Sequence, residues 1–543
     1  MKYAGPLDFM LVYLSSNLGV GQAMRPERIR QRLAALPRDR VLVVLAQLSF
    51  VADTTKYDAR YEQITRQILP EPHATKAINM MRAEPGPHEP RYRLLSSQML
   101  VALAVEAVLH CSDSDGAVSN ADLMHEVGML LLALAGNEGR VQLEDMPVEV
   151  LRMDLWARVH DFDRWAEVLH RIVSEALPAL KSEPYWIDYE RIIEAAVGIP
   201  PENFRALTAA FSTVAMADSQ GHLYPKKTDS KLIPAVEVEK WTRFYMMPVD
   251  AARRAAAEDI RDARHWSFTT FYDRPLLPLG SGSLVLVRPW FLMIKATPLG
   301  FFTDVERMIR AAGGDVTEWS NLFGKAVEWV GRRVIEENVD GGARKLLDEV
   351  AIVAAWGAGA TGQRRTCDAV LIDGDWLALD FVFHRVKKET ATTGDLSDLV
   401  SDVQKSVVGK LAQIDQTLQR GLAAEKLSGS IFPIVVIGAP FSANAAMLNL
   451  VDDMADKAGF KVIGANSRCE QPMVMDMEEF WMLLELGKHE SVFPTKLLKE
   501  WMDSPKRVSG FRSWAITEGH KLPNPRRRGY AAHAMMQLFG RVK

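Results

Sequence analysis

The stretch from Thr366 to Lys388 constrains the fold of this 543-residue chain more than any other part of it. After Asp368 comes an apolar run, then the turn-forming sequence Asp373-Gly374-Asp375, and then a second run rich in aromatic and aliphatic residues. This order predicts two adjacent strands joined by a tight turn. Because side chains alternate between the faces of a strand, we expect Asp380 to point away from the face that carries Leu379.

Asp368 at the start of the first predicted strand and Asp380 in the middle of the second are candidate catalytic and metal-binding residues. A carboxylate among large apolar side chains is costly to bury unless it has a partner, a metal ion or access to solvent. Two acids on neighbouring strands are suited to holding a divalent cation at a phosphate. The alternative is structural, with each acid capping a turn or pairing with an arginine such as Arg364, Arg365 or Arg385.

These two acids resemble the core of the PD-(D/E)XK nuclease superfamily, which has an acid, a variable gap, and then an acid and a lysine separated by one residue. Asp368 matches the first acid and Asp380 the second, whereas Val382 stands at the lysine position. The resemblance implies a restriction-endonuclease-like α/β core with a mixed central sheet, and Mg²⁺ or Mn²⁺ bound by the acids if the protein is active. The family's lysine is implied to position or activate the attacking water. The valine therefore argues for lost activity, or for a lysine supplied from elsewhere.

Four residues are candidates to replace that lysine. His384 lies two residues beyond Val382 on the same predicted strand face, Lys387 and Lys388 follow it, and Lys410 would reach in from the next predicted helix. His384 is the most direct of these, although a histidine satisfied by a neighbouring backbone group or carboxylate is its structural alternative. His384 and Lys410 join the two acids as candidate catalytic residues. Lys387 and Lys388 are also candidates for binding nucleic acid.

The segment Asn321–Glu337 has apolar residues at helical spacing and is predicted to form a helix before the hairpin. The resemblance implies that such a helix carries a metal-facing glutamate, and Glu328 is the candidate. The competing interpretation is a surface ion pair between Glu328 and Arg332, since residues at i and i+4 are neighbours on a helix.

After the hairpin, Asp402–Arg420 is predicted to form an amphipathic helix that carries Lys410 and Gln413 on neighbouring surface. The resemblance implies that a lysine or glutamine on this helix lies near the phosphates, which makes Gln413 a candidate nucleic-acid-binding residue. The segments Ser430–Pro440 and Pro472–Gly487 predict a buried strand and then a strand leading into a helix. This order of elements resembles the family over residues 270 to 500.

The N-terminal half, up to about residue 265, consists of amphipathic stretches with few strand-like alternations. It predicts a helical domain over 1–265 that recognises a partner or substrate, a nuclease-like domain over 266–504, and a basic tail over 505–543. The expected class is α+β, with an all-α half followed by an α/β core. The predicted helices of the first half are Pro26–Leu36, Val41–Phe50, Tyr57–Leu69, Leu94–His110, Ala121–Ala135, Pro147–Ala157, Asp163–Leu180 and Ile187–Val197.

Two loops in the rest of the chain have a ligand-binding interpretation and a structural one. Cys111–Asp122 has part of the acid and glycine pattern of an EF-hand calcium loop, but a cysteine occupies the first position and an aspartate the twelfth. A polar interhelical turn with an N-cap is the favoured interpretation. The sequence Gly280-Ser281-Gly282-Ser283 is expected to be a turn between two short strands, since no Lys-Ser/Thr follows it as in a phosphate-binding P-loop.

The last 39 residues differ in charge from the rest of the chain. The whole chain carries a net charge of -4, whereas residues 505–543 carry +8. Arg526, Arg527 and Arg528 form the densest basic cluster, and aromatic residues lie among the charges: Phe511, Trp514, Tyr530 and Phe539. This mixture suits phosphate contacts with base stacking, and the alternative is a solvated tail or a dock for an acidic partner.

The composition of the chain indicates which general class of protein it belongs to. With 48% hydrophobic and 25% charged residues, the chain has the composition of a globular protein. Three well-separated cysteines argue against a disulfide framework and a zinc ribbon, and the longest apolar run is too short to span a bilayer. We therefore expect a cytoplasmic protein with no membrane partner.

Two functions remain open from the sequence. The first is a metal-dependent nuclease that acts on nucleic acid, with DNA as the expected form, in prokaryotic anti-phage defence or DNA processing. The second is an inactive nuclease fold that serves as a scaffold or as a nucleic-acid-binding or protein-binding subunit of a larger complex. Protein partners would bind through the helical half, and an oligomer is compatible with both.

Overall fold

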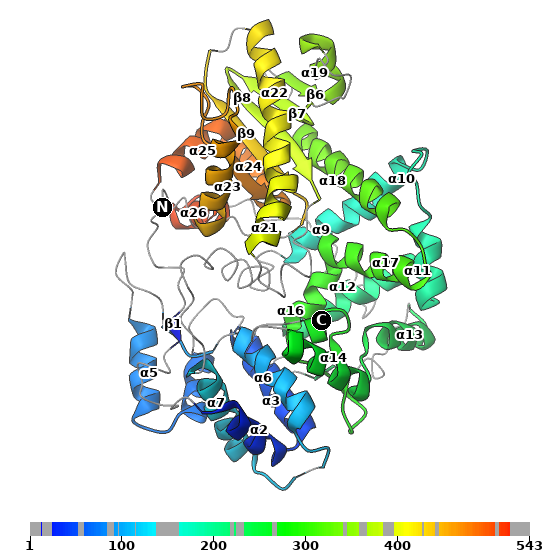
Figure 1. Ribbon diagram of the computed structural model, residues 1–543, viewed down its shortest axis with the longest axis vertical. Coiled ribbons are helices and arrows are strands. Elements are labelled where there is room, and N and C mark those ends of the chain that lie inside the picture. The colour runs from blue at the N-terminus through cyan, green and yellow to red at the C-terminus, as the bar shows by residue number, and fades with distance from the viewer. Residues whose placement is uncertain are drawn as a thin grey trace.

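The computed structural model shows a mainly helical protein with one larger sheet (Figure 1). None of the helices among the described residues combines the length and apolarity needed to cross a membrane. The structure describes residues 12–13, 24–52, 59–83, 92–95, 97–114, 116–136, 162–217, 222–223, 233–262, 269–339, 345–357, 366–383, 396–425, 428–439, 445–504 and 510–521.

The first helices form a group at one end of the molecule, coloured blue to cyan in Figure 1. Their inward sides share one apolar core with residues 247–291. A short parallel pair, β1 (Val12–Tyr13) and β2 (Tyr92–Arg93), lies beside them. The helices are α2 (Pro26–Ala34), α3 (Arg38–Ala52), α4 (Ala59–Ile68), α5 (His73–Arg82), α6 (Ser97–His110) and α7 (Asn120–Gly136).

A second set of helices leads from this group to the sheet. Its small antiparallel sheet has the order β3-β5-β4, with the predicted glycine-serine turn between β4 and β5. The elements are α9 (Phe162–Arg171), the π-helix η2 (Ile172–Ala176), α10 (Leu177–Ala179), α11 (Tyr189–Val197), α12 (Pro201–Ala217), β3 (His222–Leu223), α13 (Ala235–Tyr245), α14 (Val249–Asp262), α15 (Thr269–Tyr272), β4 (Leu276–Pro278), β5 (Leu284–Leu286), α16 (Pro289–Met293), the 3-10 helix η4 (Ile294–Ala296) and α17 (Pro298–Ala311).

The larger sheet has five strands in the order β10-β9-β8-β7-β6. β7 runs antiparallel to β6 and β8, while β8, β9 and β10 are parallel. All residues of β9 are buried, which explains its continuous apolar sequence. The sheet is therefore mixed and the protein is of the α+β class, as predicted. The strands are β6 (Lys345–Asp348), β7 (Ala369–Asp373), β8 (Asp375–Val382), β9 (Ile431–Ile437) and β10 (Met473–Asp476).

Helices cover both faces of this sheet. Leu377, Leu379 and Phe381 of β8 join the apolar core formed with α18 (Thr317–Asn338) and α24 (Met477–Glu490), whereas Trp376 and Ala378 join the core on the other face. The alternation predicted for this strand is thus confirmed. The second face is covered by α19 (Glu349–Trp356), α21 (Leu396–Val403), the π-helix η5 (Gln404–Val408), α22 (Gly409–Ala424) and α23 (Ala445–Ala458), and α25 (Pro494–Asp503) and α26 (Phe511–Thr517) pack beside α24.

The hairpin itself has the predicted turn. Asp373 pairs with Asp375, and Gly374 between them has a φ of 77°, a conformation that glycine adopts without strain. The helices predicted in the N-terminal half are confirmed apart from small shifts at their ends, except for Pro147–Ala157, which lies outside the described residues. The elements that were not predicted include the helices α5, α12, α13, α19, α23, α25 and α26 and the strand β6. The expectation of an all-α N-terminal half is wrong in detail, because the short strands β1, β2 and β3 lie there.

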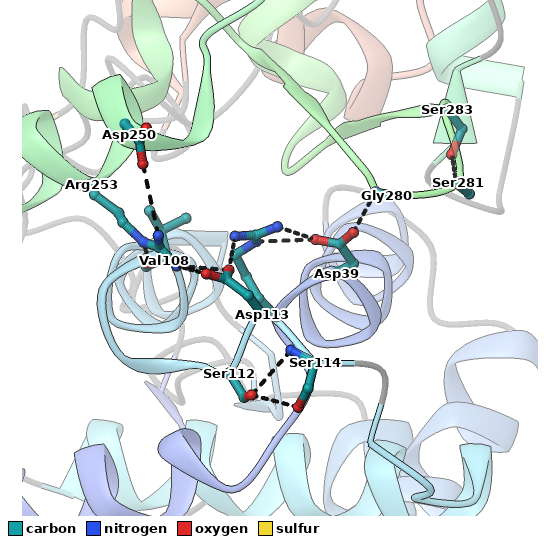
Figure 2. A network of polar contacts seen from close by, with 11 residues as sticks. Asp39, Val108, Ser112, Asp113, Ser114, Asp250, Arg253, Gly280, Ser281 and Ser283 are labelled. Carbon is teal, nitrogen blue, oxygen red and sulfur yellow. Dashed lines mark hydrogen bonds and ion pairs between the residues drawn. The ribbon is translucent and has the colours of Figure 1, made fainter.

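The calcium-like loop between α6 and α7 is a polar turn (Figure 2). The carboxylate of Asp113 accepts hydrogen bonds from Arg253 Nη2 at 2.7 and 2.8 Å and also pairs with Arg38. Ser119 Oγ accepts a hydrogen bond from the backbone N–H of Asp122 and so caps α7. Asp113 is therefore paired with two arginines, and the N-cap at Ser119 agrees with the structural interpretation of this loop. Asp115 lies outside the described residues.

Candidate active site at the start of the hairpin

Asp368 and Asp380 lie directly opposite each other across the two strands of the hairpin. Ala369 pairs with Leu379, and the backbone N–H of Asp368 donates to the Leu379 carbonyl at 3.0 Å, which continues this register by one residue. Residues that face each other across antiparallel strands project from the same side of the sheet. The two carboxyl groups therefore share one face. Asp368 Oδ2 also accepts a hydrogen bond from the backbone N–H of Phe381 at 2.7 Å, which fixes its orientation.

Lys410 is the ion-pair partner of Asp380. Its Nζ lies 2.6 Å from Asp380 Oδ1, and the Asp380 side chain has no exposed surface. Among the residues that the structure describes, no donor reaches either Asp380 oxygen with regular hydrogen-bond geometry. The ion pair is thus the interaction that offsets the burial of this charge. The partner is a lysine from α22, which differs from the arginine pairing considered as the structural alternative.

The segment that precedes β7 is held against α22. The backbone N–H of Cys367 donates to Thr417 Oγ1 at 2.9 Å, and Arg420 Nη2 donates to Thr366 Oγ1 at 3.0 Å. Thr417 lies two helical turns after Lys410, so one face of α22 both carries the lysine and positions the start of the strand. Thr417 and Arg420 were not predicted from the sequence. The seven-residue spacing in the sequence would have placed Lys410 and Thr417 on the same face of the helix.

Burial and mutual repulsion shift the titration of this site. The pKa of Asp380 is raised well above its usual range, first by burial and then by the charge of Asp368, and Lys410 opposes that shift. Burial acts to lower the pKa of Lys410, but the carboxylates of Asp380 and Asp368 outweigh it, so the pKa is raised and the lysine stays charged. The site therefore combines a firmly charged ammonium group with a carboxyl group that holds its proton more strongly than usual.

Glu328 on α18 lies close enough to this pair to interact with it electrostatically. Burial is the main cause that raises its pKa, followed by the charge of Asp368, while Lys325 and Lys410 act in the opposite direction. Its Oε2 is 2.5 Å from Lys325 Nζ. The predicted surface pair with Arg332 is therefore wrong, because the glutamate pairs with the lysine three residues before it instead. Lys325 was not predicted as part of the site, although its i,i+3 spacing to Glu328 was available in the sequence.

Gln413 lies beside Lys410 on α22, as predicted. Lys410 Nζ donates to Gln413 Oε1 at 3.4 Å. The structure thus brings together four of the predicted site residues: Asp368, Asp380 and Lys410 with Gln413, and it places Glu328 within electrostatic range. The other predicted site residues lie outside the described residues: His384, Lys387, Lys388, Arg526, Arg527 and Arg528.

Two aromatic residues proposed for base stacking in the C-terminal segment are core residues. Phe511 and Trp514 are buried in α26, where they pack in the same core as α24 and α25. Arg512 Nη1 lies 2.5 Å from Glu478 Oε1, so this arginine of the basic segment is committed to α24. The segment from 510 to 517 therefore belongs to the folded protein, and its aromatic rings are not available for stacking.

The chemistry of the site fits a hard divalent cation in part. Its carboxylate oxygens are the ligands that Mg²⁺ and Mn²⁺ prefer, and Asp380 holds two oxygens without regular hydrogen bonds. Within the described part of the chain, however, no group of three or more His, Cys, Asp or Glu side chains is arranged to hold a metal ion. Asp368 and Asp380 would therefore be the protein ligands, and water and phosphate oxygens would complete the coordination.

Comparison with models of known protein families, with curated proteins and with solved structures finds no match for this chain.

Proposed function

We propose that the protein is a divalent-metal-dependent nuclease of the PD-(D/E)XK type in which Lys410 replaces the family's lysine. The observation that carries this proposal is the contact of 2.6 Å between Lys410 Nζ and Asp380, with Asp368 opposite on the same face. The lysine comes from the helix that follows the hairpin, which explains how Val382 can occupy the family's lysine position. The order of helix, acidic hairpin, helix and strand supports the same proposal.

The acidic side chains and the lysine would have different roles in cleavage. Asp368 and Asp380 would hold Mg²⁺ or Mn²⁺, which when bound polarises the scissile phosphate and lowers the pKa of its water. Lys410, which stays protonated, would orient the attacking water and stabilise the negative charge that develops on the phosphate. Asp368 is already oriented by the hydrogen bond that its Oδ2 accepts from the N–H of Phe381, on the face of the sheet that it shares with Asp380.

The test is cleavage of plasmid, linear DNA and RNA in Mn²⁺ by the full chain and by three variants. We expect Asp368→Ala, Asp380→Ala and Lys410→Met each to lower the cleavage rate at least about a hundredfold, as removal of one electrostatic catalytic group does. Arg243→Ala is the control, because this arginine is exposed and pairs only with Glu239 on its own helix among the described contacts. Cleavage that survives in the two aspartate variants would overturn the proposal.

An inactive nuclease fold that binds nucleic acid is the second candidate. It is favoured by the ion pair that already neutralises Asp380 and by the lack of a third metal-ligand side chain among the described residues. Wild-type protein that binds DNA in a salt-sensitive manner but cleaves none of the three substrates would support this candidate.

A further inference from the structure

A groove of about 370 Å³ lies beside the candidate active site and is not explained by the chemistry above. It is formed by α18, the edge strand β6, the start of α19 and the first residue of β7. That residue, Ala369, directly follows Asp368. On α18 the groove begins at Trp329, the residue after Glu328, and Arg332 lines it one helical turn after Glu328. Ala369 pairs with Leu379 and faces α18, whereas Asp368 and Asp380 project from the other face of the sheet. The groove and the site therefore lie on either side of the start of β7.

Arg332 is the uncommitted charge of this groove. It is half-buried and makes no hydrogen bond or ion pair with the residues that the structure describes. The other charged groups there are engaged: Arg333 Nη1 lies 2.9 Å from Glu336, and Asp348 accepts a hydrogen bond from the N–H of Ala351 at 2.8 Å and caps α19. An unpaired guanidinium group that lines a groove is suited to bind a phosphate, which it can contact through two N–H groups.

Trp329 provides an aromatic surface in the same groove. Its indole ring is half-buried and lies three residues before Arg332 on α18. The guanidinium group of Arg333 lies over the ring, with 5.7 Å between its Cζ and the ring centroid, so a base would stack on the opposite face of the ring. Stacking of a base on such a ring depends on the base being unpaired, because a duplex hides both faces of each base. The volume of the groove is at the lower end of the range for small-ligand sites, which is enough for one nucleotide.

We infer that this groove binds one unpaired nucleotide of a nucleic-acid strand, with its phosphate on Arg332 and its base against Trp329. The inference takes its ligand class from the proposed nuclease function and adds a substrate class to it: strands that are unpaired next to the cleavage position. Because Ala369 lines the groove and directly follows Asp368, a nucleic-acid strand that passes around the start of β7 would contact both the groove and the site. A blunt duplex would reach the site without using the groove.

The test is fluorescence anisotropy with a labelled 12-nucleotide single strand and with the matching blunt duplex, in EDTA so that no cleavage occurs. We expect Arg332→Ala and Trp329→Leu each to weaken single-strand binding about tenfold, and to change duplex binding less than about twofold. Arg332→Lys should recover part of the loss, since it restores the charge but not the two-pronged contact. Arg243→Ala is the matched control on an exposed helix surface, and unchanged thermal unfolding shows that the variants fold.

Three results would overturn the inference: no binding of the single strand by the wild type, unchanged binding by Arg332→Ala, or an equal loss for strand and duplex. The outcome is separable from that of the proposed function, which is read from cleavage in Mn²⁺. If the wild type never cleaves but binds single strands through Arg332, the inference about the groove is supported and the proposed nuclease function is overturned. If the wild type cleaves through Asp368 and Asp380 but binds single strands independently of Arg332, the proposed nuclease function is supported and the inference about the groove is overturned.

Discussion

At the scale of single residues, the site is defined by a buried acid that depends on a lysine from another element. Asp380 has no exposed surface, and a buried carboxylate without a partner would be strongly disfavoured. Lys410 meets that requirement from α22 while it keeps its own charge. The pair therefore has a structural role beside the catalytic role proposed for it, and the structural role is measurable without any substrate.

Lys410→Met should destabilise the protein in a way that depends on pH. The folded-state pKa of Asp380 is already raised, so the folded protein holds a proton that the unfolded chain releases, and stability falls as pH rises through that window. Loss of Lys410 raises the folded-state pKa of Asp380 further, so stability falls with rising pH over a wider pH range. We expect a loss of about 3 kcal/mol in the free energy of unfolding at pH 8 and a smaller loss at pH 5, measured by urea unfolding in EDTA.

Two further variants check this prediction. Asp380→Asn combined with Lys410→Met should remove most of the pH dependence, because no buried ionisable pair remains. Lys345→Met, which removes a largely exposed pair with Glu425 on the edge strand, should change stability by less than about 1 kcal/mol at either pH. Equal losses at pH 5 and pH 8 in the Lys410 variant would contradict the assigned role of Asp380.

Part of the site was predictable at this scale and part was not. The alternation of side chains and the turn at Gly374 were enough to place Asp368 and Asp380 on one face, because both are local properties of a hairpin. Lys410 remained one of four alternatives. Which lysine reaches the acid depends on how α22 lies across β8, and spacing within one helix does not determine that packing.

At the scale of elements, the position of α18 on the sheet depends on a close contact at a glycine. A Cβ added to Gly331 would lie 2.3 Å from Cε1 of Phe381 on β8, so glycine permits the helix to approach this strand. The same helix carries Lys325, Glu328, Trp329 and Arg332. The approach at Gly331 thus sets the distance from α18 to both the candidate active site and the groove.

Gly331→Ala should destabilise the protein although alanine favours helices. Overpacking against Phe381 is expected to cost about 1 to 3 kcal/mol, which exceeds the helix-propensity gain of about 1 kcal/mol. Gly324→Ala is the matched control in the same helix, because a Cβ there meets no atom within 4 Å, and it should raise stability by up to about 1 kcal/mol. Urea unfolding of both variants tests this, and a gain of stability in Gly331→Ala would refute the close-packing argument.

The strand β6 shows why some elements were not predicted. β6 is a four-residue edge strand with the sequence Lys-Leu-Leu-Asp, which shows no alternation, and its strand conformation comes from pairing with β7. β9, by contrast, is buried on both faces and therefore has a continuous apolar sequence, which made the strand easy to predict. Elements stabilised mainly by tertiary contacts carry the weakest local signal.

At the scale of the whole molecule, the apolar cores do not follow the order of the chain. One core extends from Phe162 to Ala515 and unites the helices α9 to α13 with the larger sheet. Strand β3 pairs with β5 across residue 265, and Arg171 of α9 binds Glu337 of α18 with both Nη1–O distances near 3 Å. The change from helical to strand-like residue patterns predicted a domain boundary at residue 265. Such patterns do not show which helices pack against the strands.

These contacts predict how fragments of the chain will fold. A fragment of residues 266–543 would expose the apolar surface that Trp165, Leu207 and Trp241 now help to cover, so it should bind the dye ANS and unfold without a cooperative transition. A fragment of residues 162–543 retains that core and β3, and should unfold cooperatively in calorimetry. If 266–543 melted cooperatively, the helices α9 to α13 would be a dispensable cover for the sheet. If it did not, the candidate active site could not be separated from them, and any partner bound by these helices would act on the framework that holds Asp380 and Lys410.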